Sequence, residues 1–173
     1  MKEKSKVILL PCNSYREDSV YESLKRGTEL LGGLDRLVKK EESILLKPNL
    51  LKKAESGRPV ITHPAVVGMF ARILKEEGYE KITLGDSCGV GTTSRVISGT
   101  GMEEYLKELN IPAADFSRGV KTEFPEGIQA KEFILAQEVK ESDCVISLCK
   151  MKTHALERVT GAVKNSYGFV QGL

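Results

Sequence analysis

The stretch DCVISLC, Asp143–Cys149, is followed directly by KMKTH, Lys150–His154, and together they give the clearest indication of the fold. The first segment is an apolar run as long as a typical strand, a pattern that favours a strand buried on both faces of a parallel sheet. The second segment carries two lysines and a histidine. Ligands of open α/β sheets bind at the carboxyl ends of the strands, so these side chains are candidates for a binding site.

Three further segments have the same buried-strand pattern, namely Lys6–Cys12 (KVILLPC), Ser43–Lys47 (SILLK) and Lys81–Gly85 (KITLG). Residues 112–136 are less regular and contain prolines and glycines. We expect Phe133–Ala136 to form a strand and the residues before it to form a hairpin, which together would be a small β excursion.

Helix signals alternate with these strands. A capping box at Ser19-x-x-Glu22 precedes apolar residues at helical spacing, and Thr62-His63-Pro64 is expected to start a second helix that ends at Gly78. Thr100-x-x-Glu103 predicts a short helix through Leu109, and Thr153–Val163 is interpreted as another helix. The alternation predicts an α/β fold, a three-layer domain with a mostly parallel sheet.

Composition limits the class of protein. The 173 residues are enough for one domain, and we expect a single domain over residues 1–173, either as a short protein or as a fragment of a longer one. The net charge of +2 is too small for a dedicated nucleic-acid binder, so nucleic acid is not an expected partner. The chain has no apolar run of about 18 residues and no signal sequence, which predicts a cytoplasmic protein with no membrane partner.

The four cysteines are Cys12, Cys88, Cys144 and Cys149. None of them forms a CxxC pair, so we interpret them as buried, reduced thiols and not as a disulfide framework. The chain has no iron–sulfur cluster motif, and its two histidines make structural zinc improbable. We therefore predict no metal site and leave the cofactor open.

Polar side chains gather where the predicted strands end. The candidate ligand-binding residues are Lys47, Asn49, Ser87, Lys150, Lys152, Lys164 and Asn165. The candidate catalytic residues are His63 and His154, as proton donor or acceptor, and Asp86, which would orient one of them. Lysine and amide donors favour a small anionic ligand with a phosphate or carboxylate group. A solvated polar surface is the alternative interpretation.

The glycine-rich segment GDSCGVG, Gly85–Gly91, begins at the end of the predicted strand Lys81–Gly85. A dinucleotide-binding loop is disfavoured because Ser94 stands where its third glycine would be. The G-x-S-x-G pattern at Gly85–Gly89 would suit a nucleophilic serine, but the glycines oppose the helix that a nucleophile elbow requires. A turn is the favoured interpretation, with a backbone anion site or a nucleophilic Cys88 as alternatives.

Several motifs in the same order resemble the domain of unknown function 362 family: ILLKPNLL, THPAVV, GDSCGVG, CVISLCKMKTHALERVTGAVKN and YGFVQG, over roughly residues 43–173. The family's polar motif positions correspond here to Lys47, Asn49, Thr62, His63, Asp86, Ser87, Lys150, Lys152, His154, Thr160, Gly161, Lys164 and Asn165. Members often carry a ferredoxin-like module with two CxxCxxC motifs, which this sequence lacks.

Two hypotheses of function follow. The first is an α/β domain that binds a small anionic molecule and is either an enzyme or a binding protein. The second is a non-catalytic module of an iron–sulfur or electron-transfer protein, in which the positive edge docks an acidic redox partner or a cluster domain. The sequence leaves open the substrate, the reaction and the oligomeric state.

Overall fold

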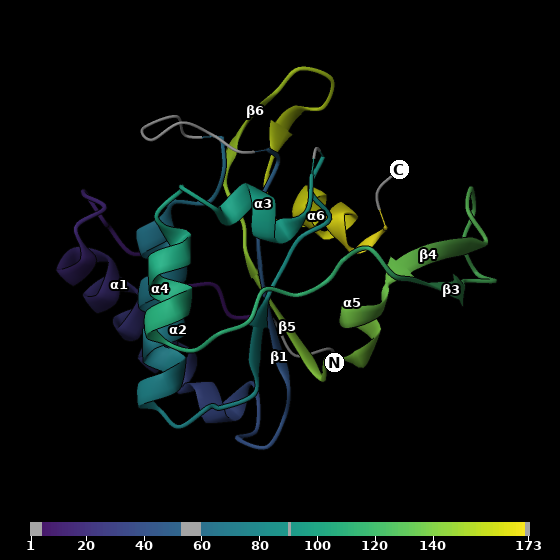
Figure 1. Cartoon of the computed structure of the whole chain (residues 1–173). Coiled ribbons are helices and arrows are strands. Elements are labelled where there is room, and N and C mark those ends of the chain that lie inside the picture. Colours follow the sequence, from purple (N-terminus) through teal and green to yellow (C-terminus); the bar gives the residue numbers. More distant parts are fainter. Residues whose placement is uncertain (1–4, 53–59, 90, 172–173) are drawn as a thin grey trace.

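The computed structural model describes residues 5–52, 60–89 and 91–171. At its centre lies a three-stranded sheet in the order β2-β1-β5, formed by Ile82–Leu84, Ile44–Pro48 and Cys144–Leu148. Strand β1 pairs in parallel with both neighbours (Figure 1). The predicted parallel sheet of an α/β fold is thus confirmed, and three of the predicted buried strands form it.

Helices cover one face of this sheet. Helices α1 (Glu17–Leu31), α2 (Pro64–Glu76) and α4 (Met102–Glu108) lie on the same side in Figure 1. The main hydrophobic core joins Ile44 of β1 to Leu74 of α2, among other buried side chains. Helix α2 begins as the sequence predicts, because His63 caps it and Pro64 is its first residue.

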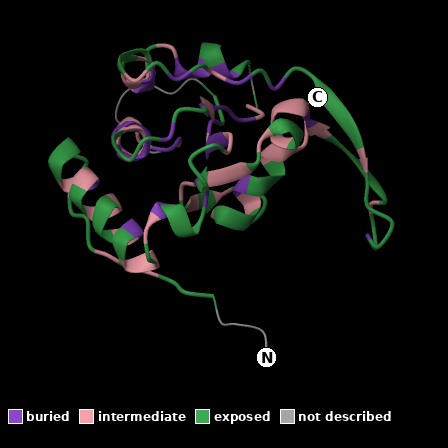
Figure 2. Cartoon of the chain, turned by 90° about the horizontal axis from the view of Figure 1, so that it is seen from below, coloured by how far each residue is buried: buried purple, intermediate pink, exposed green. Residues whose placement is uncertain are grey.

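The opposite face has a thinner cover. There Leu45 packs with Phe116 and Ala136, and helix α5 (Gln137–Glu141) contributes Val139. Strands β3 (Gly119–Glu123) and β4 (Glu132–Ala136) form an antiparallel hairpin. This hairpin extends away from the sheet and is largely exposed (Figure 2), and it confirms the predicted β excursion.

The segment after β5 differs from the prediction. The prediction of a helix over Thr153–Val163 was wrong, because strands β6 (Lys152–His154) and β7 (Arg158–Thr160) form an antiparallel hairpin there. Arg158 has a φ of 65°, which a continuous right-handed helix does not accommodate. Helix α6 (Ala162–Asn165) and the 3₁₀ helix η2 (Ser166–Phe169) follow, and they lie near the end of β5.

The N-terminal segment is also different. Lys6–Cys12 forms no strand but runs as an extended chain beside α1, with Val7 85% and Leu9 94% exposed. The segment contacts α1 on one side, while Val7 and Leu9 on the other side face solvent. The prediction of a strand buried on both faces was therefore wrong. Helix α1 begins at Glu17, with Arg16 at its N-cap, so the capping box expected at Ser19 is not formed.

Two short helices complete the fold. The 3₁₀ helix η1 (Leu34–Arg36) follows α1, and helix α3 (Thr93–Ile97) follows the glycine-rich segment. Helix α4 has Gly101 at its N-cap, although the hydroxyl of Thr100 accepts a hydrogen bond from the Met102 amide at 3.4 Å. The predicted cap was therefore one residue too early.

Candidate functional site

A buried ion pair lies where strands β1 and β2 end. Nζ of Lys47 lies 2.6 Å from Oδ1 of Asp86, and the two residues are 0% and 4% exposed. The other carboxylate oxygen of Asp86 accepts a hydrogen bond from the Leu50 amide at 2.7 Å. Lys47 also donates to Oδ1 of Asn165 at 3.3 Å, while Nδ2 of Asn165 donates to the hydroxyl of Ser147 at 2.9 Å. These bonds join β1, β5 and α6 to the segment that follows β2.

Burial governs the electrostatics of this pair. Removal from water lowers the pKa of Lys47 and raises the pKa of Asp86. The attraction between the two charges opposes both shifts without reversing them. Loss of either partner would leave the other charge buried and unpaired, which is far more costly than loss of an exposed ion pair.

The backbone of η2 covers the ion pair. A Cβ atom at Gly168 would lie 2.8 Å from Nζ of Lys47 and would also collide with the carboxylate of Asp86. The amide of Ser87 donates to the carbonyl of Gly168 at 3.3 Å, and Nζ of Lys47 lies 5.7 Å from the ring centroid of Phe169. A residue without a side chain is therefore required at position 168 for this close approach.

A cavity of about 360 Å³ opens beside the ion pair. It is lined by six of the residues predicted from the sequence: Lys47, Asn49, Asp86, Ser87, Lys164 and Asn165. The sequence did not single out Tyr167, Gly168 and Gln171, which also line it. All three belong to the YGFVQG motif, which marks the segment in the sequence but does not predict which of its residues line a cavity.

Lys152 approaches this cavity through Asn49. Its Nζ atom donates to Oδ1 of Asn49 at 2.6 Å and also to the Val60 carbonyl. The backbone N–H of Asn49 in turn donates to the hydroxyl of Thr62 at 2.9 Å, and that hydroxyl donates to the Leu148 carbonyl at 2.6 Å. Burial, reinforced by the charges of Lys164 and Lys150, lowers the pKa of Lys152.

His63 and Lys150 meet at Tyr15, which the sequence did not identify. The rings of Tyr15 and His63 are stacked, with centroids 3.9 Å apart and an interplanar angle of 7°. Nζ of Lys150 donates to the Tyr15 hydroxyl at 2.9 Å. Burial, and secondarily the charge of Lys150, lowers the pKa of His63. Nδ1 of His63 accepts from the Ala65 amide at 3.2 Å, which leaves Nε2 as the nitrogen not used by the helix cap.

His154 lies apart from the cavity lining, on the β6–β7 hairpin. Its Nδ1 atom accepts hydrogen bonds from the amides of Leu156 and Glu157, at 3.2 and 3.1 Å. Both histidines thus hold local backbone structure, and neither lines the cavity. Their catalytic roles stay predictions.

The described residues of the glycine-rich segment form neither helix nor strand, and the five-residue helix α3 begins at Thr93. Ser87 is separated from the start of that helix at Thr93, so the backbone lacks the immediate strand–turn–helix geometry of a nucleophile elbow. Burial raises the pKa of Cys88 to about 12, and the nearby Asp86 carboxylate adds to the shift. The thiol is therefore protonated at neutral pH, which argues against Cys88 as a nucleophile.

The prediction that the cysteines are buried was wrong for Cys12. All four thiols are free, but Cys12 is exposed, while Cys88, Cys144 and Cys149 are partly buried. In the described ranges, no group of three or more histidine, cysteine, aspartate or glutamate side chains is arranged to hold a metal ion. Across the same part of the chain, no helix is both long and apolar enough to cross a lipid bilayer.

The family described as "Domain of unknown function (DUF362)" matches residues 44–173, a range that contains every predicted site residue. "Thylakoid-associated protein sll1697" of Synechocystis sp. (strain ATCC 27184 / PCC 6803 / Kazusa) is 37% identical over 166 residues. The alignment covers 96% of this chain and 51% of that relative, so the chain spans about half the relative's length. No solved structure matches the chain.

Proposed function

The chain belongs to the DUF362 family, whose description names no activity, and on that premise we propose that its strand-end cavity binds a small anionic molecule. The ligand would carry a phosphate or carboxylate group. It would lie in the 360 Å³ cavity beside Lys47 and Asp86, with Lys164 at the wall and Asn49 between the cavity and Lys152.

Uncompensated positive charge is the observation that carries this proposal. Within the described residues, Lys150, Lys152 and Lys164 form no ion pair with a carboxylate, and the carboxylate of Asp86 is already paired with Lys47. Burial is the main cause of the lowered pKa of Lys152, and the charges of Lys164 and Lys150 add to it, so the ammonium groups repel one another. A bound anion would relieve this repulsion and gain charge-assisted hydrogen bonds.

The lysines would have different tasks. Lys164 lines the cavity and has only the Tyr167 ring as a partner in the described part of the chain, 6.0 Å from its centroid, so its ammonium group is available to a ligand. Lys47 is held by Asp86 and would fix the floor of the cavity. Lys152 would act mainly through its field and through the orientation that it gives to Asn49.

An acid–base role for His63 would rest on its Nε2 atom, because Nδ1 caps helix α2. The lowered pKa keeps the imidazole neutral near pH 7, the form that accepts a proton. In this proposal Asp86 acts as a positioning residue for Lys47 and does not transfer protons. Binding of an anion is the central claim, and catalysis would be built on it.

Thermal unfolding with increasing phosphate tests the proposal. A ligand that binds only the folded state stabilises it by about 2.7 kcal/mol at a hundredfold excess over Kd. Phosphate should raise the Tm of the parent and of a Lys140→Met control, since Lys140 is an exposed lysine on α5. Lys164→Met should lose most of the increase. Equal responses from all three proteins would contradict the proposed site.

A second candidate function is docking of an acidic partner, such as an iron–sulfur module. One observation favours it: exposed apolar side chains lie close in sequence to the lysines, at Met151, Leu156, Val159, Val163 and Tyr167. Apolar and basic groups together suit an interface with an acidic protein. Titration with an acidic ferredoxin should then give binding that weakens with salt, and Leu156→Ser should weaken it without altering the phosphate response.

The cytoplasmic location also stays a proposal. The relative's printed description places that protein at thylakoids, and this chain shares 37% of its residues over the aligned region. Fractionation of cells that express this chain should recover it with the soluble proteins. Recovery with membranes that is lost at high salt would instead indicate peripheral attachment.

A further inference from the structure

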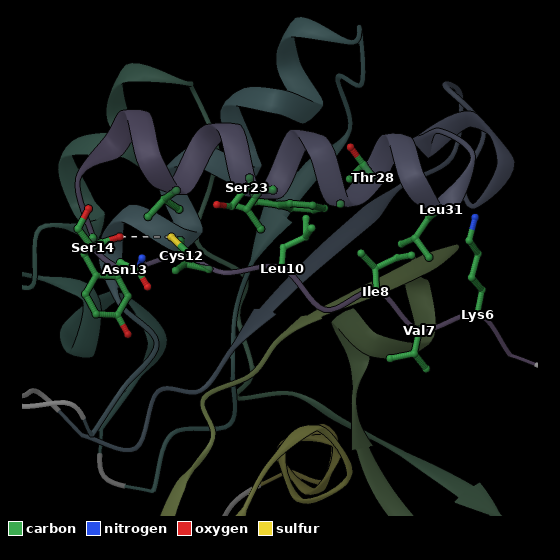
Figure 3. Close-up of a pocket in the computed structure, with 16 residues that line it drawn as sticks. Lys6, Val7, Ile8, Leu10, Cys12, Asn13, Ser14, Ser23, Thr28 and Leu31 are labelled. Carbon is green, nitrogen blue, oxygen red and sulfur yellow. Dashed lines mark hydrogen bonds between the residues drawn. The ribbon is translucent and has the colours of Figure 1, made fainter.

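A second cavity, of about 770 Å³, lies between the N-terminal segment and helices α1 and α2. Figure 3 shows Ile8 and Leu10 between the extended segment and α1, with Lys6 at one end of the cavity and Ser14 at the other. We call this cavity the N-terminal groove. It is separate from the strand-end cavity, and the two share no lining residue.

The wall of the N-terminal groove is mainly apolar. Helix α1 contributes Leu24 and Leu31, helix α2 contributes Val66 and Phe70, and the N-terminal segment contributes Leu10, among others. A volume of several hundred cubic ångströms with mostly apolar walls and a few polar groups, which here include Ser23 and Thr28 of α1, is typical of sites for small apolar or amphipathic molecules.

Polar groups at one end define the charge that this groove would accept. Tyr15 lines the groove, and its hydroxyl accepts a hydrogen bond from Nζ of Lys150 at 2.9 Å. Among the described residues, the Tyr15 hydroxyl has no acceptor for its own proton, and no aspartate or glutamate lines the groove. The Lys150 ammonium group has no carboxylate partner in the same part of the chain. This end therefore suits a negatively charged head group.

We propose that the N-terminal groove binds a single-chain anionic amphiphile of the fatty-acid class. The aliphatic chain lies along Leu10, Leu24 and Leu31, and the carboxylate accepts a hydrogen bond from the Tyr15 hydroxyl within reach of the Lys150 charge. The proposal shares the Lys150 charge with the anion site, but the residues that hold the aliphatic chain line only the N-terminal groove, so the two sites are tested separately.

The experiment measures displacement of a fluorescent fatty acid from the full chain by dodecanoate. Decanoate should bind about sixteenfold more weakly than dodecanoate, because each methylene that enters an apolar site contributes about fourfold. Dodecanol, which lacks the charge, should bind more weakly than dodecanoate. Equal affinities for the acid and the alcohol would overturn the assignment of the head group.

A steric variant tests the location. The Cβ of a residue at Gly27 would lie 3.7 Å from Cδ1 of Leu10, so Gly27→Leu has room to fold and its side chain would fill the groove. Leucine is also the better helix former, which favours a folded variant. We expect at least a tenfold loss of dodecanoate affinity, while Glu22→Leu, at an exposed position of the same helix, should bind like the parent.

Lys150→Met tests the charge. It should lower the affinity for dodecanoate about tenfold and leave the affinity for dodecanol unchanged. Gly27→Leu should keep the full response to phosphate, which separates failure at this groove from failure at the strand-end cavity. The proposal is overturned if Gly27→Leu binds dodecanoate as tightly as the parent, or if a longer protein that contains this chain excludes the fluorescent acid.

Discussion

Nζ of Lys47 lies 2.6 Å from Oδ1 of Asp86, although the two residues are 39 positions apart in the sequence. Strands β1 and β2 run in parallel, so their carboxyl ends bring the two side chains to the same edge of the sheet. Both are buried, and the pair forms the floor of the strand-end cavity. The contact links the fold to the candidate site.

Asp86→Asn should strongly destabilise the protein. The amide can still accept the hydrogen bond from Leu50, but Lys47 loses its counter-charge in the interior. Breaking a buried pair in this way costs about 3–5 kcal/mol. Urea unfolding of parent and variant measures the difference.

The double variant Lys47→Met/Asp86→Asn is the control for that prediction. Removing both charges leaves no unpaired buried ion, so its loss of stability should be smaller than the sum of the two single losses. Additive losses would mean that the two side chains act independently, and that the ion pair is not the source of the cost.

Gly168→Ala should disturb the same pair by steric contact alone. Its Cβ would lie 2.8 Å from Nζ of Lys47, so η2 must shift away or the ion pair must open. Overpacking of this kind costs about 1–3 kcal/mol. Gly161→Ala is the matched control, because its Cβ would meet nothing within 4 Å. Equal stability of the two variants would show that η2 does not lie over the ion pair as described.

His63 should titrate below its ordinary pKa of about 6.5. Because the folded state disfavours the charged imidazole, the associated stability is fully present above pH 6.5. It declines as the pH falls below that value, where the unfolded chain takes up the proton first. Lys150→Met should raise the pKa only part of the way, since burial is the larger cause.

Nuclear magnetic resonance of the imidazole protons measures both values. If the variant has the same histidine pKa as the parent, the ammonium group of Lys150 does not lie beside the stacked rings of Tyr15 and His63. A pKa above the ordinary value in the parent would mean that the ring is not buried against Tyr15.

Cysteine labelling should distinguish the four thiols. Iodoacetamide at pH 8 should modify Cys12 first, because it is exposed. Cys88 should react very slowly, because burial raises its pKa to about 12 and leaves almost no thiolate. Peptide mass spectrometry at timed intervals gives the order. Faster labelling of Cys88 than of Cys12 would revive Cys88 as a candidate nucleophile.

Sequence patterns predicted the strands of the central sheet well. They failed where an apolar segment has no neighbouring strand to pair with. Ser43–Lys47 and Lys6–Cys12 have the same continuous apolar pattern, yet only the first contributes to a strand. The pattern reports an apolar surface and cannot say whether a neighbouring strand is present. The prediction of a helix over Thr153–Val163 was wrong because Arg158 takes a left-handed conformation. Arginine rarely adopts this conformation, so the sequence does not predict it.

The candidate site shows the same division. Lys47 and Asp86 could be predicted to meet because Lys47 lies at the carboxyl end of β1 and Asp86 follows the parallel strand β2, and Asn165 joins them. The stacking of Tyr15 on His63 could not be predicted, because it depends on how the N-terminal segment lies against the start of α2. Contacts between a loop and a helix end have no periodic sequence signal.

Amide chemical-shift mapping during a phosphate titration tests the central claim most directly, since it locates the bound anion. Binding in the strand-end cavity should shift the signals of Ser87, Gly89, Lys164 and Gly168 together, with one Kd. Lys164→Met should weaken these shifts at least tenfold. The account is contradicted if phosphate leaves these four signals in place, or shifts them no more than signals beside exposed lysines such as Lys140.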